Sequence, residues 1–437
     1  MDPPYNTESA GADGNLIADN KENIKASKFI YRDKFSRNGW LNMMQERLIL
    51  ARQLLKDDGV IFVSIDDSEQ SYLKVLMDEI FGEDNFITSM PFISNLKGRQ
   101  VNVNFAKTHE YILVYKMNNF DFNTLDEKYI NSLMPSVYNT RDREVLNDNK
   151  GDYILLNTLE NSNWKFNNLS RPNLFYPIYI YKDENGKYNI SLNKNKEKYI
   201  ELWPKSNGEN LYKVWRWSKE KIEKDKNDLE VVKRGNQYYI YTKKREFDFT
   251  PKSLLLGQKL NNKNGNDLLS SLIDKNSFNT AKPLDLIKFI MKLHQSKNIR
   301  ILDFFAGSGT TGHAVLELNR EDGGNRTYTL VTNNENNIGE NITYERLYRI
   351  NTGKGTKGET FDWLKKNKPY ADNLDVFYEK TYKIGFNSKM NTSDLVKIIK
   401  KELNDFGIKT NRSDDDYLLL LRNLKALVDE KDTNEVN

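Results

Sequence analysis

The chain has 437 residues, enough for about two or three domains with separate cores, and its formal charge of +4 is too balanced to identify a partner by charge alone. With no cysteine and three histidines, the sequence excludes disulfides, cysteine-based zinc fingers and a catalytic thiol, and no metal site is expected. Because no apolar run approaches the roughly 18 residues of a membrane span and no signal peptide opens the chain, we expect a cytoplasmic protein without membrane contact.

The first part of the chain alternates between predicted helices and predicted strands. Apolar residues recur at helical spacing over 41–55 and 73–80, and both stretches predict amphipathic helices. The unbroken apolar runs 60–65 and 111–115 instead predict buried strands. This alternation is typical of an α/β domain.

The middle of the chain, from residue 118 to 249, has a different character. Its apolar runs are short and often alternate with polar residues, as over 175–181 and 238–242. Clusters of turn-forming residues separate these runs. The middle therefore predicts a mixed, β-leaning insertion.

The α/β pattern returns near Lys282. A helix is predicted over 286–293, strands over 300–305 and 328–332, and a further helix from Thr310. We therefore expect one α/β domain that the middle segment interrupts. Two polar helices are predicted in the C-terminal part, over 392–403 and 415–428.

One predicted strand runs directly into a glycine-containing turn and then a helix. Two glycines remove the Cβ atoms where a nucleotide-like ligand would cross the backbone, and the helix N-terminus presents free N–H groups. No Gly-Lys-Ser/Thr follows, so the turn is not a phosphate loop. A tight turn without a ligand is the alternative. The candidate residues are Asp303, Phe304, Phe305, Ala306, Gly307, Ser308, Gly309 and Thr310.

The chain opens on a second candidate motif, Asp2-Pro3-Pro4-Tyr5. Consecutive prolines fix the backbone and remove two N–H donors, which leaves nearby carbonyl groups to accept hydrogen bonds from a ligand. Asp2 adds a carboxylate acceptor and Tyr5 an aromatic face. This combination suits an amino group beside a planar ring, such as the exocyclic amine of a nucleobase. A polar turn without function is the alternative.

Together the two motifs resemble those of the β-class DNA amino-methyltransferases, most closely the modification subunits of type III restriction-modification systems. In that family the Asp-Pro-Pro-Tyr motif precedes an Asp-x-Phe-x-Gly-x-Gly motif, and a target-recognition insertion lies between them. The same order occurs here, and the resemblance spans residues 1–355. Other stretches that look like the family are 6–7, 40–44, 59–66, 109–115, 171–177, 282–287 and 332–337.

The resemblance implies methyl transfer to adenine N6 in DNA, with Asp2, Pro3, Pro4 and Tyr5 as catalytic residues. The target base would be flipped out of the duplex and stacked on Tyr5. Asp2 and the Pro3 carbonyl would accept hydrogen bonds from its amino group and stabilise the positive charge that develops on nitrogen. No covalent intermediate is needed, in agreement with the absence of cysteine. Aspartate at the first position favours adenine N6 over cytosine N4 by resemblance alone.

The resemblance also implies a Rossmann-like α/β sheet that binds S-adenosylmethionine as methyl donor. The cofactor would lie against the turn 303–310, with Lys282 beside its methionine part and Glu335 at its ribose hydroxyls. For Lys282 a residue at a helix start is the alternative, and for Glu335 a solvated loop charge.

Double-stranded DNA is the expected substrate, and the resemblance implies a restriction subunit that docks on the C-terminal helices; a homo-oligomer stays open. Within the insertion, Trp215 and Trp217 are expected to pack in a core rather than contact bases, with Arg216 pointing the other way. The expected regions are 1–117, the catalytic half of the methyltransferase domain; 118–255, the target-recognition insertion; 256–355, the cofactor half; and 356–437, the helical C-terminal region.

The sequence departs from the family pattern at its start, because the segment that usually precedes the Asp-Pro-Pro-Tyr motif is missing, including the strand that leads into it. Its loss would leave apolar surface and unpaired backbone groups. Three interpretations compete: a fragment of a longer or interrupted gene, which is favoured, one half of a split enzyme whose N-terminal segment acts in trans, or an intact protein. The functional alternatives are a catalytically inactive fragment, a DNA-binding specificity subunit that needs a partner chain, and, more distantly, another Gly-x-Gly nucleotide enzyme.

Overall fold

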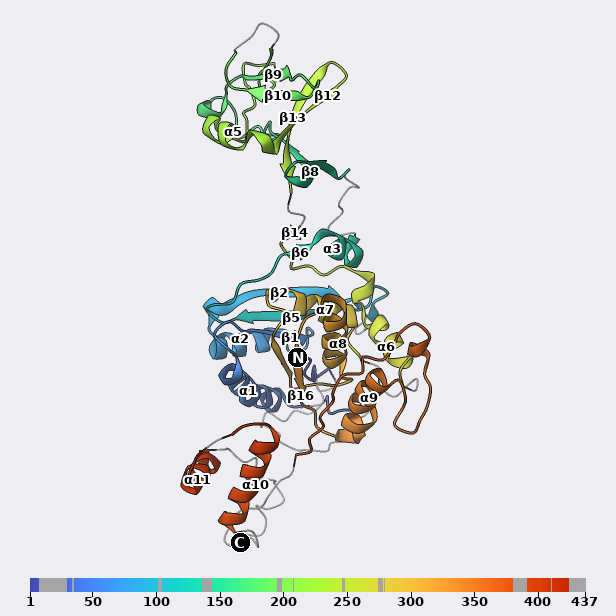
Figure 1. Cartoon of the computed structure of the whole chain (residues 1–437). Helices are drawn as coiled ribbons and strands as arrows, with labels where there is room; N and C mark the ends of the chain where they lie inside the picture. Colours follow the sequence, from blue (N-terminus) through green and yellow to red (C-terminus); the bar gives the residue numbers. More distant parts are fainter. Residues whose placement is uncertain are drawn as a thin grey trace. The chain divides into compact units, whose positions relative to one another are not determined.

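The larger part of the chain mixes helices with strands (Figure 1), which confirms the α/β class in its broad form. Two compact units, Met1–Asn373 and Leu374–Asn437, divide the chain. No helix in the ranges given below is long and apolar enough to cross a membrane. The computed structural model describes residues 1–7, 30–33, 35–100, 104–135, 144–194, 199–206, 208–245, 248–273, 278, 280–379, 391–409 and 411–423.

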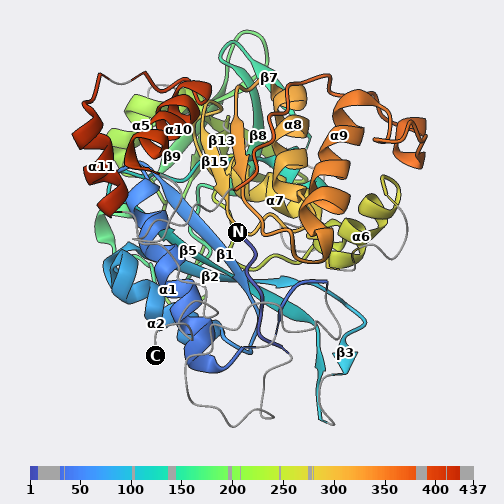
Figure 2. The same cartoon turned by 90° about the horizontal axis from the view of Figure 1, so that it is seen from below.

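The first sheet has three antiparallel strands in the order β1-β5-β2. Helices α1 and α2 pack side by side (Figure 2), and together with β1 and β5 they bury Trp40, Met44 and Tyr115 in one cluster. The helices and strands predicted in this part of the sequence are confirmed. Their bounds are α1 Arg37–Leu54, β1 Val60–Ile65, α2 Gln70–Phe81, β2 Phe86–Ile93 and β5 His109–Lys116.

A second sheet consists of two parallel strands, β15 (Arg300–Asp303) and β16 (Thr327–Leu330), which are connected through helix α8 (Thr310–Asp322). Helix α7 (Leu284–Lys292) packs against α8. The predicted strand, turn and helix are confirmed, but β15 ends at Asp303 because the following residues form the turn. The turn therefore lies at the carboxyl end of a parallel strand, where α/β proteins bind their ligands.

The two sheets are not joined by a ladder of strand hydrogen bonds within the described ranges. There β15 pairs with β16 alone, and β1 has only β5 as a neighbouring strand. Leu302 of β15 is 39 % exposed, so this strand lacks the cover that a central strand of a doubly wound sheet receives. One continuous Rossmann-like sheet stays a prediction.

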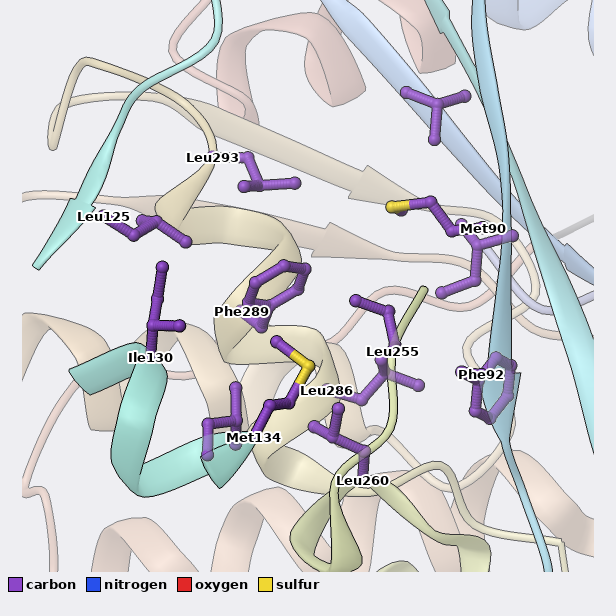
Figure 3. Close-up of a cluster of buried hydrophobic side chains, with 13 residues drawn as sticks. Met90, Phe92, Leu125, Ile130, Met134, Leu255, Leu260, Leu286, Phe289 and Leu293 are labelled. Atoms are coloured by element: carbon purple, nitrogen blue, oxygen red, sulfur yellow. The ribbon is translucent and has the colours of Figure 1, made fainter. Parts of the chain in front are cut away.

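A hydrophobic core joins segments that precede and follow the β-rich middle with a short helix from the start of that middle (Figure 3). Met90 and Phe92 of β2 pack in one cluster with Leu286 and Phe289 of α7 and with Ile130 of α3 (Glu127–Leu133). Four of these five side chains are fully buried, and Met90 is 4 % exposed. Burial of this kind contributes about 1.5–3 kcal/mol for each large apolar side chain. The core therefore holds together chain segments that the middle separates in sequence.

The middle of the chain is rich in strands, as its sequence predicts. It contains a four-stranded sheet in the order β12-β13-β8-β7 and a three-stranded sheet in the order β10-β9-β11. Trp215 is 2 % exposed and Trp217 packs against the same cluster, whereas Arg216 is exposed; the predicted packing of these residues is confirmed. The bounds are β7 Leu146–Asp148, β8 Gly151–Thr158, β9 Ile178–Lys182, β10 Tyr188–Ser191, β11 Ile200–Leu202, α5 Lys219–Asp225, β12 Leu229–Arg234 and β13 Gln237–Lys244.

In the C-terminal unit, helices α10 (Thr392–Asp405) and α11 (Asp414–Asn423) pack against each other. Both predicted helices are confirmed, except that residues 424–428 of the second lie outside the described residues. The remaining elements of the larger unit are short. They are β3 Arg99–Gln100, β4 Ala106–Lys107, β6 Leu125–Asp126, α3 Glu127–Leu133, β14 Asp248–Phe249, α6 Asn262–Ser270 and α9 Glu345–Thr352.

Candidate active site

The Asp2–Tyr5 motif begins beside strand β1. The Met1 ammonium donates a hydrogen bond to the Phe62 carbonyl (2.9 Å), and the Ser64 N–H donates one to the Met1 carbonyl (3.0 Å). Met1 thus bonds to the residues on either side of Val63, which is the hydrogen-bond pattern of parallel strands. The start of the chain therefore runs in the same direction as β1. Asp2 is thereby delivered close to the carboxyl end of that strand.

A buried tryptophan fixes the two prolines. The Trp40 indole N–H donates to the Pro4 carbonyl (2.8 Å), and the Trp40 side chain is fully buried in α1. The Pro4 carbonyl is therefore engaged by the protein itself. No partner within the described residues engages the Pro3 carbonyl, which leaves it as the acceptor that the sequence analysis assigns to a ligand.

The turn after Tyr5 is held by two buried carboxylates. Asp33 accepts hydrogen bonds from the N–H groups of Asn6 (3.0 Å) and Thr7 (2.9 Å). Glu69 accepts one from the Asn6 side-chain amide (2.8 Å). Asn6 has a φ of 59°, a left-handed conformation that asparagine tolerates better than most residues. These contacts fix the exit of the motif.

The glycine turn is shaped by Asp303 at the end of β15. The Asp303 carboxylate accepts a hydrogen bond from the Phe305 N–H (3.2 Å) and another from the Thr311 hydroxyl (2.6 Å). Gly307 and Gly309 have φ values of 51° and 73°, which a residue with a Cβ adopts only at a cost. The turn therefore needs glycine at both positions.

A buried arginine donates hydrogen bonds to the glycine turn. Arg346 of α9 is fully buried and donates to the Ser308 carbonyl (3.2 Å) and to the Thr310 hydroxyl (2.8 Å). Burial lowers the pKa of Arg346 to about 9. The Thr343 hydroxyl donates to the Gly307 carbonyl (2.6 Å). Both side chains act on the backbone of the turn.

Lys282 connects the two motifs, which lie about three hundred residues apart in the sequence. Its carbonyl accepts a hydrogen bond from the Thr310 hydroxyl (3.4 Å), at the start of α8. Its ammonium lies 2.9 Å from Asp2 Oδ1 and 3.3 Å from Glu110 Oε2. Only 8 % of the Lys282 side chain is exposed. Lys282 therefore contacts both the glycine turn and the Asp2–Tyr5 motif.

Glu110 of β5 is the second carboxylate of this cluster. It accepts hydrogen bonds from the Tyr5 hydroxyl (3.0 Å) and from the side-chain amide of Asn262 (2.8 Å). The Lys282 ammonium also lies 4.8 Å from the centre of the Tyr5 ring. Glu110 and Lys282 thus fix both the hydroxyl and one face of Tyr5.

The electrostatics of the cluster differ from group to group. Burial raises the pKa of Asp2, and the Lys282 ammonium opposes this effect only in part. Burial also acts to raise the pKa of Glu110, but Lys282 and the Tyr5 hydrogen bond outweigh it, so this pKa is lowered. Burial acts to lower the pKa of Lys282, yet the two carboxylates outweigh it and the pKa is raised. The cluster therefore holds one firmly protonated ammonium between two carboxylates.

Asp2 Oδ1 is the atom of the cluster with unused bonding capacity. It is shielded from solvent and paired with the Lys282 ammonium at 2.9 Å, which engages one of its two lone pairs. Buried carboxylate oxygens are ordinarily hydrogen-bonded. Asp2 Oδ1 is therefore ready to accept a hydrogen bond from a ligand.

Glu335, which the resemblance predicts to bind the ribose hydroxyls, lies just beyond β16. Its carboxylate accepts a hydrogen bond from the backbone N–H of Arg32 (3.0 Å). The side-chain amide of Asn336 donates to the Ile30 carbonyl (2.5 Å). Residues 30–33 therefore link the Glu335 loop to the turn that Asp33 holds.

A family model described as DNA methylase matches residues 1–397, and the chain belongs to this family. The EcoPI Mod subunit of a type III restriction-modification enzyme, from Escherichia phage P1, is 32% identical over 92% of this chain and 63% of its own length. The StyLTI Mod subunit from Salmonella typhimurium is 30% identical over 90% of this chain and 58% of its own length. The type II methyltransferase M.KpnI from Klebsiella pneumoniae is 29% identical over 80% of this chain and 78% of its own.

The resemblance to type III modification subunits, predicted from the motifs, is confirmed by these comparisons. The chain spans less than two thirds of the length of both Mod subunits.

Several site residues were not predicted from the sequence. Glu110 lies within the stretch 109–115 that resembles the family, but no role was assigned to it. Its signal is a carboxylate that directly precedes the apolar run 111–115 of β5. Asp33, Glu69 and Asn262 carry no comparable signal, because only the fold brings them to the motif.

Proposed function

We propose that the chain is a site-specific DNA methyltransferase of the type III modification kind, which transfers a methyl group from S-adenosylmethionine to adenine N6 within a restriction-modification system. One observation carries this proposal: Asp2 Oδ1 is buried and paired with the ammonium of Lys282, whose backbone contacts the glycine turn. Membership of the DNA methylase family and similarity to Mod subunits support it.

The residues of the glycine turn fit S-adenosylmethionine. Gly307 and Gly309 both have positive φ values and leave the approach to the N-terminus of α8 without Cβ atoms. We assign the turn from Asp303 to Thr310 to cofactor binding and Glu335 to the ribose hydroxyls. When bound, the cofactor supplies a methyl group on a sulfonium centre. The contacts of Lys282 favour a role at Asp2 over its predicted place beside the cofactor.

The Asp2–Tyr5 motif acts on the amino group of the target base. Asp2 Oδ1 and the Pro3 carbonyl accept hydrogen bonds from the amine, which orient the nitrogen and weaken the delocalisation of its lone pair into the ring. The same acceptors stabilise positive charge as it develops on that nitrogen. Tyr5 stacks on the flipped base. The nitrogen finally loses a proton, for which Asp2 is the nearest acceptor.

The organisation and partners follow from the same assignment. We assign 1–117 and 256–355 to the two halves of the methyltransferase domain and 118–255 to recognition of double-stranded DNA. We assign 356–437 to contacts with a restriction subunit or a second copy of the chain. The similarity to Mod subunits supports these assignments. A cytoplasmic location follows from a DNA substrate.

A second candidate is a chain that binds DNA but needs another segment or subunit for methyl transfer. The single neighbour of β15 in the described ranges and the 39 % exposure of Leu302 favour it, because a complete α/β sheet covers such a strand. DNA binding without binding of S-adenosylmethionine would support this candidate.

The test is to incubate the chain with methyl-labelled S-adenosylmethionine and unmethylated genomic DNA, digest the DNA and identify the labelled nucleoside. Label in N6-methyladenine, and none with an Asp2→Ala variant, is the expected result. Label in N4-methylcytosine would contradict the assigned base. A folded chain that binds DNA but not S-adenosylmethionine, and that labels no nucleoside, would contradict the proposal and support the second candidate.

Replacing Gly265 by alanine is expected to lower methyl transfer through Lys282. A Cβ on Gly265 in α6 would lie 2.7 Å from the Lys282 carbonyl oxygen, so residues 281–282 would have to move. Such overpacking costs about 1–3 kcal/mol. A fall in kcat of about tenfold would correspond to the lower part of that range. Steady-state kinetics beside a thermal melt would measure both effects; unchanged kcat would show that the position of Lys282 does not matter.

A further inference from the structure

The Lys282 ammonium is buried between two carboxylates that come from different parts of the fold. Asp2 comes from the start of the chain and Glu110 from β5, and both lie within 3.3 Å of the ammonium. The Lys282 backbone is itself fixed by the Thr310 hydroxyl at the glycine turn. The side chain that reaches Asp2 is therefore anchored at the opposite motif.

We propose that Lys282 and Glu110 are positioning residues for methyl transfer: Lys282 holds the Asp2 carboxylate ionised and oriented, and Glu110 holds Lys282 and Tyr5 and keeps the cluster negatively charged. The inference rests on the proposed function and deepens it. It assigns Lys282 to the amine side of the site and gives Glu110 a role that the sequence motifs do not contain.

The charges of the cluster explain why two carboxylates are needed. An ion pair of Asp2 and Lys282 alone is neutral, and it would offer little stabilisation to an amine that becomes positively charged. Glu110 adds a second negative charge, so the cluster carries a net charge of about −1. A preorganised negative charge at this place stabilises the developing cation without reorganisation.

Orientation is the second contribution of the cluster. Glu110 accepts hydrogen bonds from the Tyr5 hydroxyl and from the Asn262 side-chain amide, one on each carboxylate oxygen, and these two bonds fix its orientation. The Lys282 ammonium lies over one face of the Tyr5 ring, at 4.8 Å from its centre. A flipped base must then stack on the other face. The cluster thus sets both the acceptor and the stacking surface.

Other charged or titratable groups near Asp2 do not replace Lys282. The Met1 ammonium is bound to the Phe62 carbonyl. Tyr31 and Asp33, from the segment before α1, act on the same region, but Tyr31 has its pKa raised by burial and stays neutral. Lys282 is therefore the cation that opposes the effect of burial on Asp2.

Three substitutions test the proposal: Lys282→Met, Lys282→Arg and Glu110→Gln. The measurements are kcat and KM for methyl transfer from mildly acidic to mildly alkaline pH. Without Lys282 the Asp2 pKa rises, so the acid limb of the pH profile of kcat, where kcat falls toward low pH, should shift to higher pH by about one unit or more. In Glu110→Gln a negative charge beside Asp2 is lost and the Asp2 pKa falls. The acid limb should therefore shift to lower pH, while kcat falls about tenfold. Lys282→Arg should restore the position of the limb.

Lys288→Met is the matched control. Lys288 is another buried lysine that pairs with a carboxylate, Glu321, but it lies on α7 outside the site. Its loss should leave the acid limb in place. Lys282→Met and Glu110→Gln variants that lower kcat with no opposite shift of the limb would overturn the proposal. So would a Lys282→Met variant that weakens only the binding of S-adenosylmethionine.

A titration of ¹³C-labelled aspartate carboxyl groups by NMR gives the same answer without catalysis. The Asp2 resonance, identified by its loss in Asp2→Ala, should titrate at higher pH in Lys282→Met than in the parent chain. An unmoved Asp2 pKa would overturn the proposal. Because this readout does not need methyl transfer, failure of the proposed function and failure of the inference are distinguishable.

Discussion

Replacing Asp2 by alanine is expected to reduce methyl transfer by about a thousandfold, the upper range for removal of one preorganised group that stabilises developing charge. The substitution removes the buried acceptor Oδ1 and leaves the Lys282 ammonium next to the place where positive charge develops. The glycine turn is untouched, so binding of S-adenosylmethionine should change little. The effect should therefore appear in kcat.

Single-turnover transfer of a labelled methyl group, with calorimetry of cofactor binding, separates these expectations. Asp2→Asn is the informative companion, because asparagine keeps an acceptor oxygen but carries no charge. It should lie between the parent chain and Asp2→Ala. A thousandfold loss in cofactor affinity, with unchanged transfer once the cofactor is bound, would contradict the role given to Asp2.

Replacing Gly309 by alanine is expected to weaken binding of S-adenosylmethionine by about tenfold or more, since a non-glycine residue in the left-handed region costs about 1–3 kcal/mol. Gly309 has a φ of 73°, and a Cβ there would lie 3.3 Å from the Thr343 side chain. The Thr343 hydroxyl holds the Gly307 carbonyl, so a shift of Thr343 would disturb the whole turn. Equilibrium dialysis with labelled cofactor measures the change.

Gly323→Ala provides the matched control for this prediction. Gly323 ends the same helix that Gly309 begins, its φ is 66°, and no atom lies within 4 Å of a Cβ built on it. Both variants should lose similar backbone stability, but only Gly309→Ala should lose cofactor affinity. Equal affinity in the two variants would argue against the glycine turn as the cofactor site.

Local patterns predicted the elements well. Unbroken apolar runs gave β1 and β5, and helical spacing gave α1, α2 and α7, because each signal lies within a dozen or so neighbouring residues. The strand, turn and helix around Gly307 could be predicted for the same reason. The last residue of β15 could not be predicted, since Phe304 and Phe305 are as apolar as the residues of a buried strand. In the structure β15 ends at Asp303, and Phe304 and Phe305 already belong to the turn.

Contacts between distant segments could not be predicted in the same way. The sequence does not reveal that the Lys282 ammonium contacts Asp2 and Glu110, and its predicted place beside the cofactor stays a prediction. The direction in which a long charged side chain points depends on the charged groups that the fold places near it. The antiparallel pairing of β1 with β5 is another such property, because an apolar run does not reveal the direction of its neighbour.

The most direct test of the central claim, that the two motifs form one active site, is a crystal structure of the chain with S-adenosylmethionine bound. The account predicts the cofactor on the turn from Asp303 to Thr310. Its methyl group should point at the space between Asp2 and Tyr5, leaving room for an amine at about 3–3.5 Å. A cofactor bound elsewhere, or one whose methyl group points away from Asp2, would contradict the account.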